Sequence, residues 1–307
     1  MRIAFVGKGG SGKTTAAAAF SRHLAASGRR VLAVDADINQ HLGAALGYGG
    51  APPRALGADL GWLKEHLRGT NPRLPRADEM IKTTPPGRGS RLVDLGADDA
   101  VLRRFAVATP DGVRLLVAGA FAADDVGVAC YHAKTGAVEL YLNHLVDRPG
   151  EYVVVDMTAG ADAFASGLFT RFDLTVLVSE PTRRGVGVYR QYAELAAGHG
   201  VALAVLGNKV ADAADVEWLH GEVGAALLGC LSASAWVRAA ERGAPAPFAE
   251  LEADNRAVLA DVRAALDARE RDWAAYHRTT VAMHRANATA WAGVDRIAQI
   301  DPDFVPV

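Results

Sequence analysis

The sequence predicts an α/β protein with a doubly wound, mostly parallel sheet, helices on both faces and a C-terminal helical extension. Six short runs are apolar at nearly every position, as is typical of parallel strands buried on both faces. Helical segments long enough for right-handed crossovers lie between them. The runs are residues 2–7, 30–37, 113–119, 152–157, 174–181 and 202–209, and the helices are expected to begin near Lys13, Gly136, Arg184 and Ala213.

Polar or glycine residues stand at the carboxyl ends of four of these runs. They are Gly7, Asp35, Asp156 and Asn208. Ligands of doubly wound sheets bind beyond the carboxyl ends of the strands. We therefore expect these four segments to converge on one site.

Composition narrows the class of protein. Half of the 307 residues are apolar, and the formal charge of -2 gives no basic excess of the kind that nucleic-acid binding requires. Two cysteines, Cys130 and Cys230, are too few for a disulfide framework, which favours a cytoplasmic location. No apolar run approaches the ~18 to 20 residues of a membrane-spanning helix, so we expect no membrane anchor.

The chain is expected to divide at about residue 248. Residues 1–248 form the main domain, and within them residues 49–110 are rich in Gly, Pro and Arg, which predicts a loop-rich insertion over the ligand site. Residues 249–307 form the C-terminal helical extension packed on the core. Its apolar residues at helical spacing are Val258, Leu259, Val262, Leu266, Trp273, Tyr276, Met283 and Trp291. Too few Lys and Arg accompany the aromatic residues for a membrane helix.

The opening stretch "MRIAFVGKGGSGKTT" fits two phosphate-binding motifs. Gly7, Gly9 and Gly12 spell the dinucleotide fingerprint G-x-G-x-x-G, and residues 7–14 spell the triphosphate loop G-x-x-x-x-G-K-[ST]. Only the second motif explains Lys13 and Thr14, which supply an ammonium to the β- and γ-phosphates and a hydroxyl to Mg²⁺. A nucleoside triphosphate is therefore favoured. The expected phosphate contacts are Gly9, Gly10, Ser11, Gly12, Lys13, Thr14 and Thr15.

A second lysine, Lys8, follows the first glycine of the loop. The stretch "KGGSGKTT" resembles the deviant Walker A motif, K-G-G-x-G-K-[ST], of the MinD/ParA group of P-loop ATPases. The resemblance implies a P-loop NTPase fold, hydrolysis of ATP to ADP and phosphate, and a homodimer in the ATP-bound state. It also implies that Lys8 reaches the phosphates bound by the partner subunit and, with Lys13, contributes to catalysis.

Two acidic stretches continue the resemblance. In "VDADIN" it implies that Asp37 orients the attacking water and that Asp35 lies beside the Mg²⁺ shell. In "VVVDMTAGAD" it implies that Asp156 binds Mg²⁺ indirectly, through water, at the site where Thr14 supplies its hydroxyl, and that Gly160 lets the backbone sense the γ-phosphate. These roles suit phosphoryl transfer, which needs an in-line water and neutralised charge rather than covalent participation.

The stretch "LGNKVAD" concerns the base. A GTPase would read N-K-x-D, but Ala211 stands at the acidic position and Asp212 comes one residue later. ATP is therefore favoured, with Asn208 near the adenine amino group and Pro181 of "SEPT" flanking the ring. Slack in the loop that brings Asp212 to the base would instead allow GTP.

The stretch around Cys130 bears on the branch of the family. The chain lacks the basic surface of partition ATPases, the basic membrane helix of Min-type ATPases and the Met-rich insert of tail-anchored-protein carriers. Its motif layout is similar to CooC-like metalloenzyme accessory ATPases, with Cys130-Tyr131-His132 where those proteins have C-x-C. Two copies of Cys130 and His132 across a dimer axis would form a Cys₂His₂ set suited to Zn²⁺. The alternative is that Cys130 is a small buried apolar residue, as we expect for Cys230.

Together these features predict an ATP-binding and ATP-hydrolysing dimeric switch that assists maturation of, or metal delivery to, a partner protein. Two alternatives stay open: a ParA/Min-type positioning or partition adaptor, and an ATP-dependent ligase-like enzyme. No arginine finger is evident, so intrinsic turnover is expected to be slow, with Arg183 or Arg184 as candidates to approach from the partner subunit.

Overall fold

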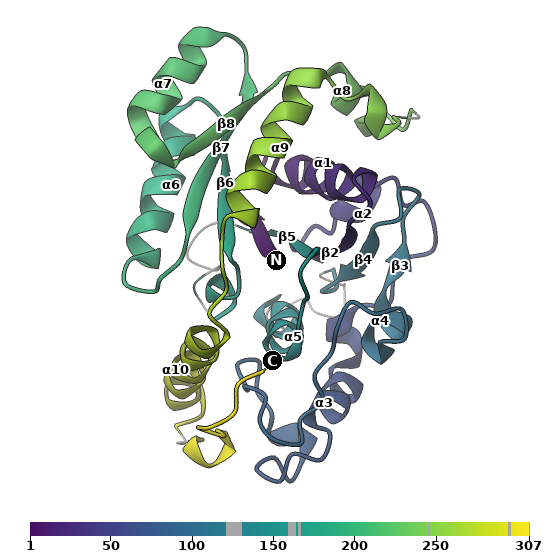
Figure 1. Cartoon of the computed structure of the whole chain (residues 1–307), viewed down its shortest axis with the longest axis vertical. Coiled ribbons are helices and arrows are strands. Elements are labelled where there is room, and N and C mark those ends of the chain that lie inside the picture. Colours follow the sequence, from purple (N-terminus) through teal and green to yellow (C-terminus); the bar gives the residue numbers. More distant parts are fainter. Residues whose placement is uncertain (121–130, 159–163, 165–166, 245, 294–295, 307) are drawn as a thin grey trace.

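The sheet has eight strands in the order β3-β4-β2-β5-β1-β6-β7-β8. The computed structural model describes residues 1–120, 131–158, 164, 167–244, 246–293 and 296–306. Every neighbouring pair is parallel except β3 with β4, so the predicted doubly wound fold is confirmed (Figure 1). The strands are β1 (Arg2–Val6), β2 (Arg30–Ala36), β3 (Val107–Ala108), β4 (Arg114–Val117), β5 (Glu151–Met157), β6 (Leu174–Ser179), β7 (Leu203–Val210) and β8 (Leu227–Ser232).

The six predicted strands correspond to β1, β2, β4, β5, β6 and β7, whereas the two edge strands were not predicted. β3 has only two residues. β8 contains Gly229 and Cys230, has no β-branched residue, and is half-exposed along most of its length. Strand periodicity is weak under those conditions, and pairing with β7 determines the conformation instead.

The apolar runs are continuous because both faces of the sheet are covered. In β1, Ile3 and Phe5 pack into the core on one face, while Ala4 and Val6 pack into the core on the other. All four residues are fully buried. Alternation of polar and apolar residues, the usual mark of a half-exposed strand, is therefore absent from β1.

Helices cover both faces. The face that contains Ile3 and Phe5 is covered by α1 and α9, and the opposite face is covered by α3 and α5. The bounds are α1 (Lys13–Ala26), α2 (Leu42–Ala45), α3 (Leu60–Arg68), α4 (Ala100–Phe105), α5 (Tyr131–His144), α6 (Arg183–Ala196), α7 (Ala213–Val223), α8 (Ala235–Glu241), α9 (Ala253–Asp267) and α10 (Trp273–Ala292). The predicted starts near Lys13, Arg184 and Ala213 agree with α1, α6 and α7, whereas α5 begins at Tyr131, before the expected Gly136.

Residues 49–110 start at the carboxyl edge of the sheet and then run beside α5. The amide of Gly57 donates to the carbonyl of Ala118, just beyond β4, at 3.0 Å. Further along, Leu63 and Leu67 on α3 are fully buried in the core that α5 also lines. The segment thus covers a helix as well as adjoining the ligand edge.

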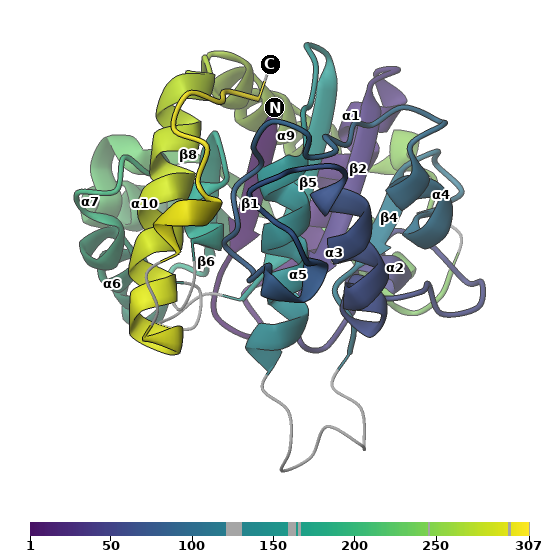
Figure 2. The same ribbon diagram turned by 90° about the horizontal axis from the view of Figure 1, so that it is seen from below.

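The C-terminal extension contains two helices that pack on opposite faces of the sheet. Leu259, Val262 and Leu266 of α9 enter the core next to α1. α10 lies beside α5, where the Tyr276 hydroxyl donates to the carbonyl of Leu142 at 3.1 Å (Figure 2).

A buried ionic network anchors the junction of these two helices. Arg2 donates from Nε to Asp147 Oδ1 at 2.7 Å, and Arg271 reaches the same oxygen at 2.6 Å. Arg271 also pairs with Asp173 at 2.5 Å. The linker between α9 and α10 is therefore tied to β1. None of the helices in the described ranges is long and apolar enough to span a membrane.

Candidate nucleotide-binding site

The loop between β1 and α1 has the conformation that phosphate binding requires. Gly12 has φ +90° and immediately precedes Lys13, the first residue of α1. Lys8, Gly9 and Gly10 are exposed, and the amide of Ser11 closes a turn onto the carbonyl of Lys8 at 3.0 Å. Exposed loop amides therefore lead into a helix N-terminus, an arrangement that attracts anions.

Two residues at the end of β7 hold this loop from the other side. The Asn208 amide donates to the carbonyl of Ser11 at 2.7 Å. Lys209 donates to the carbonyl of Gly10 and to Glu180 Oε1, both at 2.7 Å. Sequence reasoning assigned Asn208 to the base and assigned no role to Lys209 or Glu180. Lys209 has φ +58°, which is uncommon for a residue with a side chain. The residue with this backbone conformation is the one whose side chain contacts the phosphate loop at Gly10.

Lys13 and Thr14 each contact a predicted acid. Lys13 Nζ lies 2.8 Å from Asp37 Oδ2, and Thr14 Oγ1 donates to Asp156 Oδ2 at 2.6 Å. Asn39 donates to Asp37 from its backbone and its side chain, at 2.9 and 3.1 Å. Burial raises the pKa of Asp37, but the hydrogen bonds from Lys13 and Asn39 outweigh it and leave the pKa below its ordinary value. Asp37 is therefore ionised at neutral pH.

Asp35 and Asp156 form a buried acidic pair. They are register partners on β2 and β5, and both are fully buried. Burial, together with the neighbouring Asp156, raises the pKa of Asp35 to about 7, although it accepts from the amide of Leu42 at 2.8 Å. Burial raises the pKa of Asp156 to about 6, against the opposing effect of Lys13 and Thr14. Two carboxylates held together out of water favour a cation beside them.

The oxygen donors present fit Mg²⁺. Asp156 Oδ1 is buried and has no hydrogen-bond partner among the described residues. The Thr14 hydroxyl contacts the other oxygen of the same carboxylate. No cluster of three or more His, Cys, Asp or Glu side chains suited to a metal ion occurs within the described parts of the chain. Proteins usually hold Mg²⁺ through one or two side chains together with water and substrate phosphates, which is the number of donors that Thr14 and Asp156 offer.

The far end of the site bears on the choice of base. The Asp212 carboxylate accepts from the amide of Asp215 at 3.1 Å and caps α7. Pro181 follows β6, and the next residue, Thr182, caps α6 through a hydrogen bond from the amide of Gly185 at 3.1 Å. Asp212 thus already has a structural partner.

One side of the phosphate loop faces a small cleft of about 30 Å³. Lys8 and Arg184 both line it, and both are exposed. Arg183, the neighbouring candidate, is exposed in the first turn of α6. Two cations, Lys8 and Arg184, therefore lie together beside the phosphate loop.

Three predicted site residues lie wholly or partly outside the part of the chain that the structure describes. Cys130 and Gly160 lie outside the described residues. His132 falls within the first turn of α5, of which only the backbone is described. Cys230 is a free, half-buried cysteine on β8, packed against Gly207. The Cys130–His132 metal site thus stays a prediction.

Comparison with known proteins settles the family. Residues 3–232 match the CobQ/CobB/MinD/ParA nucleotide binding domain. The chain belongs to this family. It is 31% identical over 220 residues to the carbon monoxide dehydrogenase accessory protein CooC of Rhodospirillum rubrum, a match that covers 71% of this chain and 78% of that protein. An uncharacterized ATP-binding protein of Methanocaldococcus jannaschii is 28% identical over 213 residues, covering 68% of this chain and 75% of that protein.

Solved structures of the family share the fold. The MinC:MinD cell division protein complex of Aquifex aeolicus contains a chain with a TM-score of 0.58 and 19% identity, covering 88% of this chain and 97% of that one. MinD of Pyrococcus horikoshii, complexed with Mg-ADP, has a TM-score of 0.56 and 18% identity, covering 87% and 97%. The predicted resemblance to MinD/ParA-type P-loop ATPases is thereby confirmed.

Proposed function

We propose that this chain binds ATP with Mg²⁺, hydrolyses ATP to ADP and phosphate, and acts as a homodimeric switch on a partner protein in the cytoplasm. The observation that carries the proposal is the meeting of Lys13 with Asp37 and of Thr14 with Asp156 at the mouth of the phosphate loop. These contacts join three separate segments of the sequence beside the phosphate loop, where we propose that the γ-phosphate binds. The Mg-ADP complex of the MinD from Pyrococcus horikoshii supports the choice of ligand.

Each side chain has a separate task in the proposed reaction. Backbone amides of residues 9–15 bind the phosphates, and Lys13 leaves Asp37 to bind the β- and γ-phosphates. Asp37, now without that partner, accepts a hydrogen bond from the attacking water and orients it in line. Thr14, Asp35 and Asp156 would hold Mg²⁺, which when bound neutralises charge on the phosphate oxygens.

Adenine is the favoured base. Guanine recognition requires a carboxylate that accepts from two donors of the base, and Asp212 instead caps α7. Asn208 holds the loop at Ser11, and we propose that Asn208 and Pro181 lie beside the adenine. We therefore infer a preference for ATP over GTP.

Dimerisation is proposed to depend on Lys8. It is exposed next to Arg184, where it is free to cross to nucleotide on a second subunit. Light scattering with ATP and Mg²⁺ tests this role. The wild type should dimerise with ATP but not with ADP, Lys8→Ala should bind ATP and stay monomeric, and Lys13→Ala should lose ATP binding. Equal dimerisation of Lys8→Ala and wild type would disprove the role of Lys8.

The relationship to CooC supports a role in metalloenzyme maturation or metal delivery. We propose that Cys130 and His132 of two ATP-bound subunits hold one Zn²⁺, since a thiolate and an imidazole suit that ion. Elemental analysis of the dimer under zinc-replete conditions tests this, with Cys230→Ser as the matched control. The expected result is one zinc per dimer, lost in Cys130→Ser and kept in Cys230→Ser. A ratio near zero, or one unchanged in Cys130→Ser, would refute the site.

A further inference from the structure

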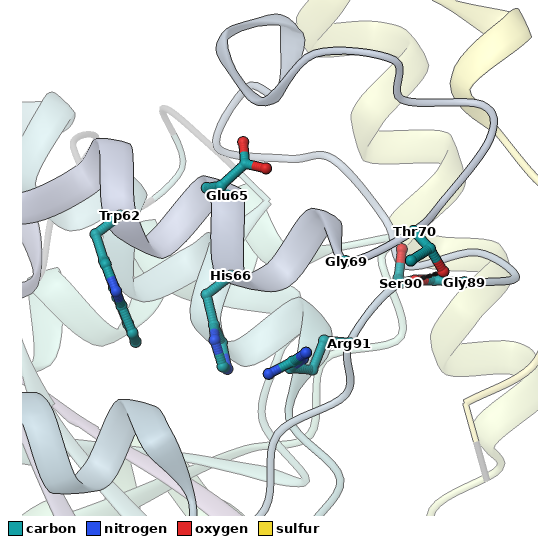
Figure 3. Close-up of a pocket in the computed structure, with 8 residues that line it drawn as sticks. All are labelled: Trp62, Glu65, His66, Gly69, Thr70, Gly89, Ser90 and Arg91. Carbon is teal, nitrogen blue, oxygen red and sulfur yellow. Dashed lines mark hydrogen bonds between the residues drawn. The ribbon is translucent and has the colours of Figure 1, made fainter.

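A second cavity lies beside α3, formed by different residues from those of the phosphate loop. Its volume is about 450 Å³, and Trp62, Glu65 and His66 of α3 line it together with residues 69–70 and 89–91 (Figure 3). The volume is within the range of about 300 to 1,000 Å³ that is usual for small-molecule sites. None of the assigned nucleotide-site residues belongs to its lining.

One wall of this cavity is a stack of flat side chains. The rings of Trp62 and His66 lie one turn apart on α3, with centroids 4.8 Å apart and planes at 11°. Arg104 packs over the indole of Trp62, its Cζ 4.6 Å from the ring centroid, and Phe105 meets the same ring edge-on at 5.6 Å. Figure 3 shows both rings pointing the same way, with the Arg91 side chain directed towards His66. The stack fixes the position of this wall through contacts among protein side chains.

The two loops that complete the cavity are fixed to each other. The amide of Thr70 donates to the carbonyl of Gly89 at 2.8 Å, and the amide of Arg91 donates to the carbonyl of Leu67 at 2.9 Å. Arg91 is thereby held opposite the end of α3. The cavity is preformed by backbone hydrogen bonds as well as by side-chain stacking.

The polar groups of the cavity are mostly donors. Within the part of the chain that the structure describes, no protein acceptor bonds the side-chain nitrogens of Trp62, His66 or Arg91. Glu65 is at the rim, and its carboxylate is paired with Arg68 at 2.5 Å. Asp99, the acid whose charge acts on His66, accepts from the amide of Leu102 at 2.9 Å. One guanidinium and two ring N–H groups therefore belong to the residues that line the cavity and have no protein acceptor among the described residues.

We propose that this cavity binds a small organic anion, with carboxylate or phosphate oxygens on Arg91 and an apolar part against the ring of His66 and the edge of Trp62. Arg is the side chain best suited to planar recognition of either oxyanion. A bare inorganic ion would fill only a small part of 450 Å³, which is why the ligand is expected to carry an organic part. This site goes beyond the proposed nucleotide function and does not depend on it.

Three probes test the proposal: citrate, glucose 6-phosphate and inorganic phosphate. The readout is the indole N–H signal of Trp62 in ¹⁵N-labelled full-length protein, assigned by its loss in Trp62→Phe. At least one organic anion should shift this signal saturably at millimolar concentration, and Arg91→Gln should weaken that binding tenfold or more. Arg103→Gln, which removes an exposed arginine of α4 outside the cavity lining, is the matched control and should bind like wild type.

Each other outcome counts against the site. No saturable shift with either organic anion, or equal binding by Arg91→Gln and wild type, would overturn the proposal. Binding of inorganic phosphate as tight as that of both organic anions would refute the organic part of the ligand. ATP affinity measured on the same Arg91→Gln sample should equal that of wild type, so that failure here is distinguishable from failure of the nucleotide site.

Discussion

Replacing Gly12 by alanine should damage the phosphate loop in two separable ways. An added Cβ at Gly12 would lie 2.1 Å from Asn208 Nδ2, which must then move and release the carbonyl of Ser11. The residue also has φ +90°, where a side chain adds strain. The strain costs roughly 1–2 kcal/mol and the lost hydrogen bond on the order of 1 kcal/mol, so the free energy of unfolding should fall by about 2–3 kcal/mol.

Two further variants separate the contributions. Gly10 has φ +84° but nothing within 4 Å of an added Cβ, so Gly10→Ala should cost only the strain, roughly 1–2 kcal/mol. Asn208→Ala should cost on the order of 1 kcal/mol for the hydrogen bond. Because Gly12→Ala has already broken that bond, the double variant Gly12→Ala/Asn208→Ala should be no less stable than Gly12→Ala alone.

Urea unfolding of the nucleotide-free protein measures these changes. Wild type, Gly12→Ala, Asn208→Ala and the double variant form a double-mutant cycle, and Gly10→Ala is a separate control for the strain. The account of the loop would be refuted if Gly12→Ala cost no more than Gly10→Ala. It would also be refuted if the double variant lost the full sum of the two single effects, because Asn208 and Gly12 would then be energetically independent.

Two other predictions concern the base and the buried ionic network. Isothermal titration should give tighter binding of ATP than of GTP, and Asp212→Ala should leave the ratio of these two affinities unchanged. The same variant should lower the free energy of unfolding by about 1 kcal/mol, since Asp212 caps α7. Tighter binding of GTP would reverse the assignment. Burial raises the pKa of Asp147, but Arg2 and Arg271 outweigh it and hold the pKa well below its ordinary value. The stability that a lowered pKa contributes is fully present above about pH 4, the ordinary pKa of Asp, and is lost progressively as the pH falls from there through the folded-state pKa. The free energy of unfolding of Asp147→Asn should therefore be about 3–5 kcal/mol below that of wild type at pH 7. In urea unfolding this difference should shrink towards pH 3, and a difference independent of pH would contradict the prediction.

The phosphate loop and its acids are predictable because short sequence patterns determine them. The glycines, Lys13 and Thr14 occupy fixed positions in one motif, and Asp35 and Asp156 each follow an apolar strand. Parallel strands bring their carboxyl ends to one edge, so a site at that edge follows from the fold class. The register of β2 with β5 then makes these two acids neighbours.

Contacts that join distant segments are not predictable in this way. Lys209 reaches Gly10 only because β6 and β7 pair beside the loop, and its positive φ has no signature in the stretch "GNKVAD". The anchoring of α10 depends on Arg2, Asp147 and Arg271, which stand far apart in the sequence. Arg2 in particular resembles an ordinary first residue of a strand, although its side chain is fully buried.

Replacing Asp37 provides the most direct test of the proposed switch. ATP binding, dimer mass and phosphate release should be measured on one preparation each of wild type and Asp37→Ala, with Mg²⁺ present. Asp37 contacts Lys13 in the structure, and it is proposed to orient the attacking water when ATP is bound. Asp37→Ala should therefore bind ATP at least as tightly as wild type, accumulate the dimer and release phosphate at least a hundredfold more slowly. Phosphate release at the wild-type rate by Asp37→Ala would contradict the account.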